Sequence, residues 1–169
     1  MVVWLIGLSG SGKTTLAKKI VAGANKKLKN TVLVDGDIIR EVFGNDLGYS
    51  MDDRLLNAQR ICQIGKFLDE QGFNVVCAIL SLFPETRDWN RDNIKDYYEV
   101  FIDVPIDILV DRDSKGIYAK YIKAEISDVA GMDIHFPVPE RADLVIDNSK
   151  SKDDLLAYSD SIIEKILQV

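Results

Sequence analysis

Five short apolar runs alternate with longer segments in which apolar residues recur at helical spacing. The runs span 2–6, 31–34, 74–80, 98–104 and 143–147, each short enough to form one strand. The third run is almost wholly apolar, as expected of a strand buried on both faces of a parallel sheet. Alternating strands and helices predict an α/β fold with a five-stranded parallel sheet and helices on both faces.

The helical segments carry start and stop signals. Apolar spacing predicts a helix over 15–21, separated from the first strand by residues 7–14. A long helix is expected to be capped by Asp52 or Asp53 and to run to about Gln71, where Gly72 ends it. The remaining predicted helices begin at Pro84, end at Asp111 and span 153–167.

Residues 7–14, Gly-Leu-Ser-Gly-Ser-Gly-Lys-Thr, fit the phosphate-binding loop pattern G-x-x-x-x-G-K-[ST] between a strand and a helix. Backbone N–H groups of such a loop, together with the helix N-terminus, bind phosphate oxygens. In this motif Lys13 reaches the β- and γ-phosphates, and the Thr14 hydroxyl binds Mg²⁺. The alternative, a glycine-rich turn that binds nothing, does not explain the flanking strand and helix. The sequence therefore predicts a three-layer P-loop nucleoside-triphosphatase fold whose ATP-binding loop residues are Gly7, Ser9, Gly10, Ser11, Gly12, Lys13, Thr14 and Thr15.

Length and charge narrow the class of protein. A chain of 169 residues predicts a single domain over 1–169. The net charge of −6 argues against nucleic acid as the partner, so any anionic substrate must meet a local cluster of Arg and Lys. No apolar run approaches the roughly 18 residues of a membrane span, and no signal peptide is recognisable. With Cys62 and Cys77 expected as buried, reduced thiols, we expect a cytoplasmic protein.

Two carboxylates follow the second strand in Asp35-Gly36-Asp37. Ligands of open α/β sheets gather at the carboxyl ends of the strands, so both side chains are expected near the phosphate loop. Asp35 has the alternative role of merely ending the strand. The segment 112–139 is rich in charges and in glycine and proline breaks, and it is the part least able to bury itself. We interpret it as a lid that excludes water from the phosphoryl group.

Four further motifs extend the pattern beyond the phosphate loop. Residues 35–40 read D-G-D-x-x-R, 53–60 read D-R-x-x-N-x-x-R, and 112–118 read R-D-x-K-G-I-Y. Residues 46–50 read Asp-Leu-Gly-Tyr-Ser, with Tyr where Phe is usual. In this order the motifs resemble the adenylylsulfate kinases, which use ATP to phosphorylate the ribose 3′-hydroxyl of adenosine 5′-phosphosulfate. The resemblance covers essentially the whole chain. It leaves a homodimer open, since relatives commonly dimerise.

The resemblance implies roles for residues on the ATP side. Lys13 and Asp37 would be catalytic, with Asp37 activating the acceptor hydroxyl or helping Thr14 to organise Mg²⁺. Arg112 and Lys115 would cover the phosphates or the base of ATP when the lid closes. A kinase needs a carboxylate near the attacking hydroxyl and fixed cations around the phosphate, because positioning and electrostatics supply most of the rate.

The resemblance also implies an acceptor site in which Arg40, Arg54 and Asn57 contact a small anionic nucleotide. Arginine presents a planar fork suited to anionic groups, although both arginines also fit a solvated helix surface. The predicted acceptor-binding residues are Asp37, Arg40, Tyr49, Arg54, Asn57, Leu80, Ser81 and Val129.

The departures from the family pattern fall on the acceptor side and the lid. The second of two phenylalanines that usually sandwich the adenine is Val129, and S-P-[YF] after the third strand is Ser-Leu-Phe at 81–83. The lid patterns A-R-x-G-x-I and Y-E-x-P are altered at 121–126 and 136–139. We therefore hypothesise a changed acceptor, as in the related kinases of cytidine diphosphoramidate in bacterial capsule modification. A pyrimidine needs a smaller clamp than adenine. Ordinary adenylylsulfate kinase activity in sulfate assimilation is the alternative.

Other classes of function remain as rivals. A gluconate- or shikimate-type kinase would share the fold, but the D-R-x-x-N and R-D-x-K-G elements speak against it. An ATP-binding sensor without turnover would be expected to lack Lys13 or Asp37, and both are present. An inactive relative kept as a binding partner would bind nucleotides without turnover.

Overall fold

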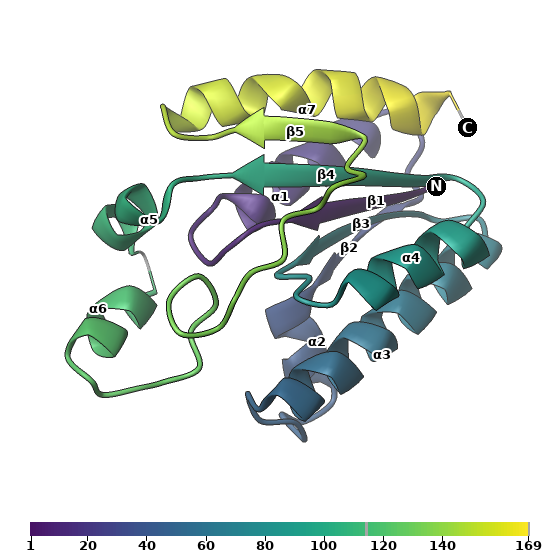
Figure 1. Cartoon of the computed structure of the whole chain (residues 1–169). Helices are drawn as coiled ribbons and strands as arrows, with labels where there is room; N and C mark the ends of the chain where they lie inside the picture. Colours follow the sequence, from purple (N-terminus) through teal and green to yellow (C-terminus); the bar gives the residue numbers. More distant parts are fainter. Residues whose placement is uncertain (114, 169) are drawn as a thin grey trace.

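The chain forms one parallel sheet whose strand order is β2-β3-β1-β4-β5. The computed structural model describes residues 1–113 and 115–168, so Ser114 of the predicted lid and Val169 lie outside the described residues. All four strand pairings are parallel, as Figure 1 shows. The α/β fold predicted from the alternating pattern is confirmed. Its strands are β1 (Val2–Ile6), β2 (Thr31–Asp35), β3 (Asn74–Ile79), β4 (Tyr97–Asp103) and β5 (Leu144–Asp147).

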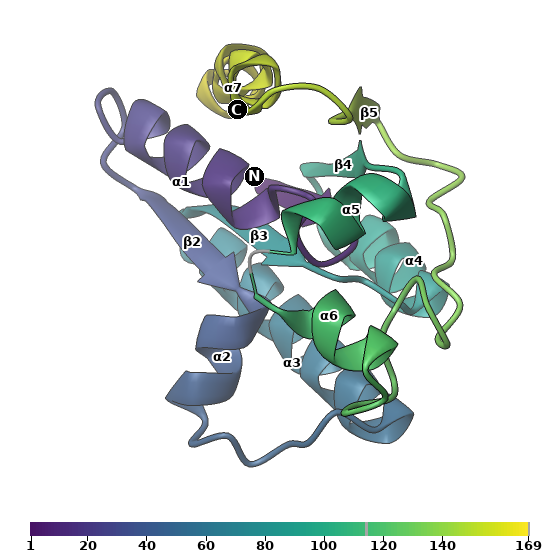
Figure 2. The ribbon, with the colours of Figure 1, turned by 90° about the vertical axis from the view of Figure 1, so that its left-hand side faces the viewer.

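Helices cover both faces of this sheet (Figures 1 and 2). One face is covered by α1 (Lys13–Ala24) and α7 (Lys152–Leu167), and the other by α3 (Met51–Glu70) and α4 (Pro84–Asn93). Three shorter helices lie toward the carboxyl ends of the strands, where the ligand site of such a sheet is expected. They are α2 (Gly36–Val42), α5 (Ile106–Arg112) and α6 (Ile117–Ile122).

The central strand β1 explains why the sheet divides the core into two layers. Every side chain of β1 is buried, and successive side chains point to opposite faces. Val3 and Leu5 pack with the α1 and α7 layer, whereas Trp4 packs with the α3 layer. The phosphate-binding motif directly follows this strand, so the loop is attached to a fully buried strand at the centre of the sheet.

The N-terminal cap of α3 differs from the one that the sequence predicts. Ser50, and neither Asp52 nor Asp53, caps α3, since the Ser50 side chain accepts a hydrogen bond from the backbone N–H of Asp53. The aspartates instead occupy the first turn, where negative charge is favoured by the helix dipole. The short helix α2 was not among the helices predicted from apolar spacing. It forms with Asp35 as its N-cap.

The lid segment is anchored more firmly than its composition predicts. Tyr118 is fully buried, and its hydroxyl donates a 3.0 Å hydrogen bond to the backbone oxygen of Ser9 in the phosphate loop. Val129 and Ala130 are also buried, so the expectation that this segment buries little is wrong at these positions. Among the described residues, no helix is both long and apolar enough to cross a membrane.

Candidate active site

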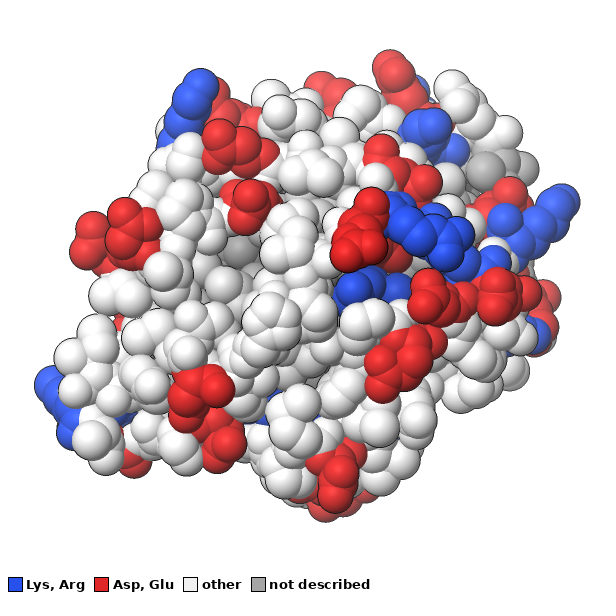
Figure 3. Space-filling model, viewed as in Figure 1, with Lys and Arg blue, Asp and Glu red and all other residues white. Residues whose placement is uncertain are grey.

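A pocket of about 650 Å³ opens at the carboxyl ends of the central strands. The phosphate loop, α2, α3, the end of β3 and the lid all contribute to its wall. On the face of the molecule shown in Figure 3, basic side chains are mixed with acidic ones. Most predicted site residues line the pocket: Ser9, Gly10, Gly12, Lys13, Thr14, Thr15, Asp37, Arg40, Tyr49, Arg54, Asn57, Leu80, Ser81, Lys115 and Val129.

Three predicted residues lie outside the pocket wall. Gly7 and Ser11 support the loop from behind: a Cβ atom on Gly7 would lie 2.7 Å from the backbone oxygen of Ile102. Arg112 lies apart from the pocket and donates a 3.0 Å hydrogen bond to the backbone oxygen of Lys150. A contact between Arg112 and ATP therefore stays a prediction.

The phosphate loop is held by backbone geometry and by a distant side chain. Gly10 and Gly12 have φ angles of 77° and 99°, in the left-handed region that glycine adopts without strain. Asn148, just after β5, donates a 2.9 Å hydrogen bond from Nδ2 to the backbone oxygen of Ser11. Asn148 was not among the predicted site residues, because no local motif marks it.

Lys13 lies over the loop that precedes it. Its Nζ donates hydrogen bonds of 2.8 and 2.7 Å to the backbone oxygens of Gly7 and Leu8. Burial and the positive charge of Lys115 lower the pKa of Lys13 to about 8, although Asp35 and Asp37 oppose the shift. A partly desolvated ammonium of this kind interacts strongly with anionic phosphates.

Asp35 has a larger role than ending a strand. Its Oδ2 accepts a 2.7 Å hydrogen bond from the Thr14 hydroxyl, and its Oδ1 accepts one of 3.0 Å from the backbone N–H of Asp37. The carboxylate thus joins the phosphate loop to α2 and lines the pocket. It was missing from the predicted site. Its place at a strand end beside the loop was the signal that could have included it.

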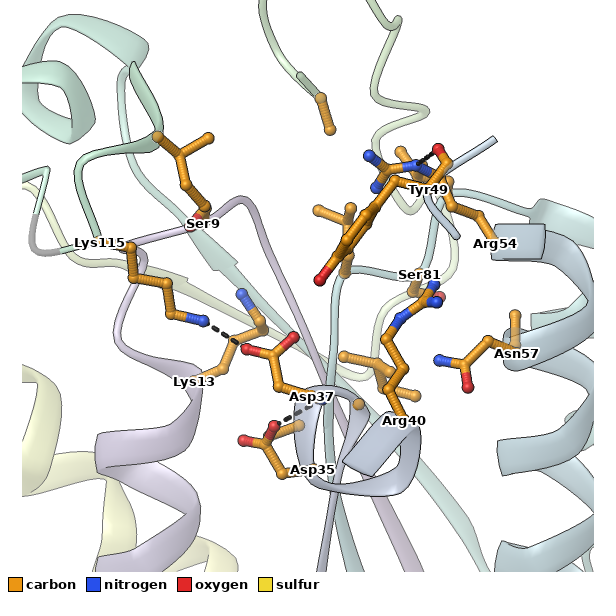
Figure 4. Close-up of a pocket in the computed structure, with 18 of the residues that line it drawn as sticks. Ser9, Lys13, Asp35, Asp37, Arg40, Tyr49, Arg54, Asn57, Ser81 and Lys115 are labelled. Carbon is orange, nitrogen blue, oxygen red and sulfur yellow. Dashed lines mark hydrogen bonds and ion pairs between the residues drawn. The ribbon is translucent and has the colours of Figure 1, made fainter. Parts of the chain in front are cut away.

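The predicted lid segment contacts the opposite wall of the pocket through an ion pair. Lys115 Nζ bonds to Asp37 Oδ2, as the dashed line in Figure 4 marks. Partial burial lowers the pKa of Lys115, but the hydrogen bond and charge of Asp37 raise it overall. The predicted lid cation and the predicted catalytic carboxylate are therefore direct neighbours.

Two arginines frame Tyr49 on the other side of the pocket (Figure 4). The guanidinium carbon atoms of Arg40 and Arg54 lie 4.9 and 5.5 Å from the centroid of its ring. Arg40 is buried and donates to the backbone oxygens of Leu47 and Gly48, at 3.2 and 2.8 Å. It is therefore not the solvated surface arginine that formed the alternative interpretation.

Arg54 links α3 to the lid. Its Nε donates to the backbone oxygen of Tyr49 and its Nη2 to that of Asp128, each at 2.7 Å. Burial and the charge of Arg40 lower its pKa. Two adjacent cations thus concentrate positive charge at one end of the pocket, in a chain of net charge −6.

Asn57 contributes a buried acceptor to the same wall. Its side chain is 6% exposed, and its Oδ1 has no hydrogen-bond partner among the described residues. Leaving such an acceptor unpaired is unfavourable, and a donor on a bound molecule would satisfy it. Val129 also lines the pocket and belongs to the buried core.

Comparison with known proteins decides the family. The adenylylsulphate kinase family model matches residues 1–147. The chain belongs to the adenylylsulfate kinase family. It is 40% identical over 165 residues to the cytidine diphosphoramidate kinase of Campylobacter jejuni, and the alignment covers 98% of this chain and 95% of that protein. It is 36% identical over 156 residues to the adenylyl-sulfate kinase of Pseudomonas aeruginosa, covering 91% of this chain and 80% of the relative.

A solved structure agrees with this assignment. The APS kinase of Mycobacterium tuberculosis, in complex with AMPPNP and APS, superposes with a TM-score of 0.88 at 31% identity, covering 98% of this chain and 96% of that one. The family resemblance inferred from the motifs is confirmed. This kinase is therefore a phosphotransferase that uses ATP and a nucleotide-type acceptor with an alcohol group.

Proposed function

We propose that this kinase transfers the γ-phosphate of ATP to the ribose 3′-hydroxyl of cytidine diphosphoramidate, in the pathway that adds phosphoramidate to a bacterial capsule. The observation that carries the proposal is Val129, a buried aliphatic side chain on the pocket wall where the family pattern has a base-stacking phenylalanine. The identity of 40% to a cytidine diphosphoramidate kinase supports the same acceptor.

The size of the base supports a pyrimidine. Tyr49 keeps an aromatic ring on the pocket wall, whereas Val129 offers no second ring. Loss of a stacking aromatic costs about 1–3 kcal/mol when the base is unchanged. A one-ring base has less surface to cover than adenine. Valine in place of phenylalanine at position 129 therefore removes less binding free energy from a pyrimidine nucleotide than from an adenine nucleotide.

Magnesium is part of the proposal. The Thr14 hydroxyl and the Asp35 carboxylate, 2.7 Å apart, are hard oxygen donors of the type that Mg²⁺ prefers. Mg²⁺ keeps several waters and phosphate oxygens as ligands, so it needs only one or two protein groups. When bound, the ion would neutralise charge on the β- and γ-phosphates.

The remaining roles follow from position. Lys13 would bridge the β- and γ-phosphates, and Arg40 and Arg54 would hold the anionic groups of the acceptor. Asp37 would accept the proton of the 3′-hydroxyl or orient the metal. Its pairing with Lys115 supports a lid that brings a cation to the reaction centre as it closes over the substrates.

A side-by-side assay of ATP consumption tests the acceptor. We expect a higher kcat/KM with cytidine diphosphoramidate than with adenosine 5′-phosphosulfate. In Lys13→Ala we expect no turnover with either acceptor. A higher kcat/KM with adenosine 5′-phosphosulfate would contradict the proposal and favour ordinary adenylylsulfate kinase activity. Binding of ATP without turnover on any nucleotide would favour a sensor.

We further infer a cytoplasmic homodimer. Use of ATP and two free, buried cysteines support the location. Exposed apolar side chains at Ile38, Val42 and Phe43, on and just after α2, support a surface that a second copy would cover. Light scattering of the purified chain tests the assembly, and a monomer over the micromolar range would contradict it.

A further inference from the structure

The loop that follows β3 forms part of the pocket wall, and its backbone is strained. Ser81 has a φ of 57°, in the left-handed region that is unfavourable for a residue with a Cβ atom. Ser81, Leu82 and Phe83 all line the pocket. Such a conformation persists only where surrounding contacts fix it.

Arg87, on α4, supplies the main contact behind this loop. Its Nη1 donates a 2.9 Å hydrogen bond to the backbone oxygen of Ser81, and both residues are buried. Trp4 adds a longer bond of 3.4 Å from Nε1 to the Ser81 hydroxyl. Arg87 does not itself line the pocket, so it would act on a bound molecule through Ser81.

Arg87 is in turn held by a buried carboxylate on β4. Glu99 is 1% exposed, and its Oε1 lies 3.9 Å from Arg87 Nε. The other oxygen, Oε2, accepts a 3.0 Å hydrogen bond from the Tyr97 hydroxyl and lies 3.4 Å from Arg91 Nη2. A carboxylate this deeply buried requires such partners. A continuous polar connection therefore runs from β4 through Arg87 to Ser81.

We propose that Arg87 is a positioning residue for the acceptor: it holds the backbone of Ser81 and thereby fixes the pocket wall over 81–83. The inference rests on the proposed function in one respect, since it takes this wall to face the acceptor nucleotide. The phosphate loop hangs from β1 and is held separately by Asn148. Loss of the Arg87 contact should therefore change acceptor binding and leave ATP binding nearly unaltered.

The test is Arg87→Lys, which keeps a cation beside Glu99 but removes the fork that reaches Ser81 as well. We expect the acceptor KM to rise about tenfold, as for the loss of one hydrogen bond from a charged donor, with the ATP KM changing less than about twofold. The matched control is Arg91→Lys, which alters the other arginine at Glu99 but not the contact to Ser81. It should leave the acceptor KM within about twofold of the wild type.

A second pair of variants separates positioning from general stability. In the Arg87→Lys background, Ser81→Gly should restore much of the acceptor KM, because glycine adopts the left-handed conformation without the contact. Ser81→Ala also removes the hydroxyl but retains the Cβ atom, so it should restore nothing. Equal behaviour of these two double variants would overturn the proposal.

Two further outcomes would overturn it: a parallel rise in both KM values in Arg87→Lys, or the same acceptor effect in Arg91→Lys. All measurements use whichever of the two nucleotide acceptors the wild-type chain phosphorylates faster. If that is adenosine 5′-phosphosulfate, the proposed function fails, while the role of Arg87 is still decided by the pattern of KM values.

Discussion

The Thr14 hydroxyl lies 2.7 Å from the carboxylate of Asp35, so the phosphate loop and the end of β2 meet at one pair of oxygen atoms. The same carboxylate caps α2 and orients Asp37, the first acidic residue of that helix. One side chain thus sets the relative positions of the proposed metal ligand and the proposed catalytic carboxylate.

We predict that Asp35→Asn raises the Mg²⁺ concentration needed for half-maximal activity by about tenfold or more, because groups that orient metal ligands typically contribute 10–100-fold to metal binding. Titration of Mg²⁺ at fixed ATP measures the effect. Asp92→Asn, which changes an exposed carboxylate on α4, serves as control. An unchanged Mg²⁺ requirement in Asp35→Asn would show that the carboxylate has only a capping role.

Lys13 makes stability depend on pH in a defined direction. Its pKa is about 8 in the folded chain against 10.5 for the free side chain. Between these values the unfolded state binds more protons at this site, so the free energy of unfolding gains a contribution that increases with pH. Burial raises the pKa values of Cys77 and Tyr97. The folded state therefore binds more protons at these two sites, and their contribution to the free energy of unfolding decreases with pH in this range.

The contribution of Lys13 is therefore measured as a difference. We predict that the free energy of unfolding of the wild type, minus that of Lys13→Met, increases as the pH rises from about 8 toward 10.5. Urea unfolding without nucleotide at pH 7, 8, 9 and 10 provides the values. A difference that stays constant over this range would mean that Lys13 titrates normally in the fold.

The sequence was most informative where function depends on neighbours in the chain. The bounds of β1 and the phosphate loop could be predicted because five apolar residues run directly into the glycine motif. The pocket residues Arg40, Arg54 and Asn57 on α2 and α3 followed from the resemblance to the adenylylsulfate kinases, through the motifs at 35–40 and 53–60. Each of these motifs is local in the sequence.

Contacts between distant segments could not be predicted in this way. Asn148 holds Ser11, Tyr118 holds Ser9, and Arg87 holds the strained Ser81 loop. Apolar periodicity shows that a position is buried, but it does not show which distant polar group pairs with it. The lid segment was expected to bury little for the same reason. Charged residues surround Tyr118 in the sequence, and no local pattern indicates that Tyr118 is buried.

Asp37 provides a prediction that separates chemistry from binding. We expect Asp37→Asn to lower kcat by at least about a hundredfold, in the range of lost general-base catalysis, with a much smaller change in ATP affinity. Single-turnover kinetics and nucleotide titration measure the two effects. Lys115→Met is the companion variant, because it breaks the same ion pair and leaves the carboxylate in place. Equal losses of turnover and ATP affinity in Asp37→Asn would contradict the catalytic role.

Arg54 tests the acceptor end of the pocket. It binds the backbone of Tyr49 and that of Asp128, so it supports both the aromatic wall and the lid while presenting its charge to the pocket. We predict that Arg54→Ala raises the acceptor KM about 10–100-fold, the range expected for losing hydrogen bonds of a charged group, with the ATP KM little changed.

Initial rates with each substrate varied in turn give both constants for Arg54→Ala. Lys66→Ala, on the same helix but in an exposed ion pair with Glu70, controls for loss of a positive charge from α3 and should leave both constants unchanged. Arg54 contacts Asp128 in the predicted lid, so the test must separate acceptor binding from the proposed closure over ATP. An ATP KM that rises by the same factor as the acceptor KM would therefore assign Arg54 to lid closure and not to the acceptor.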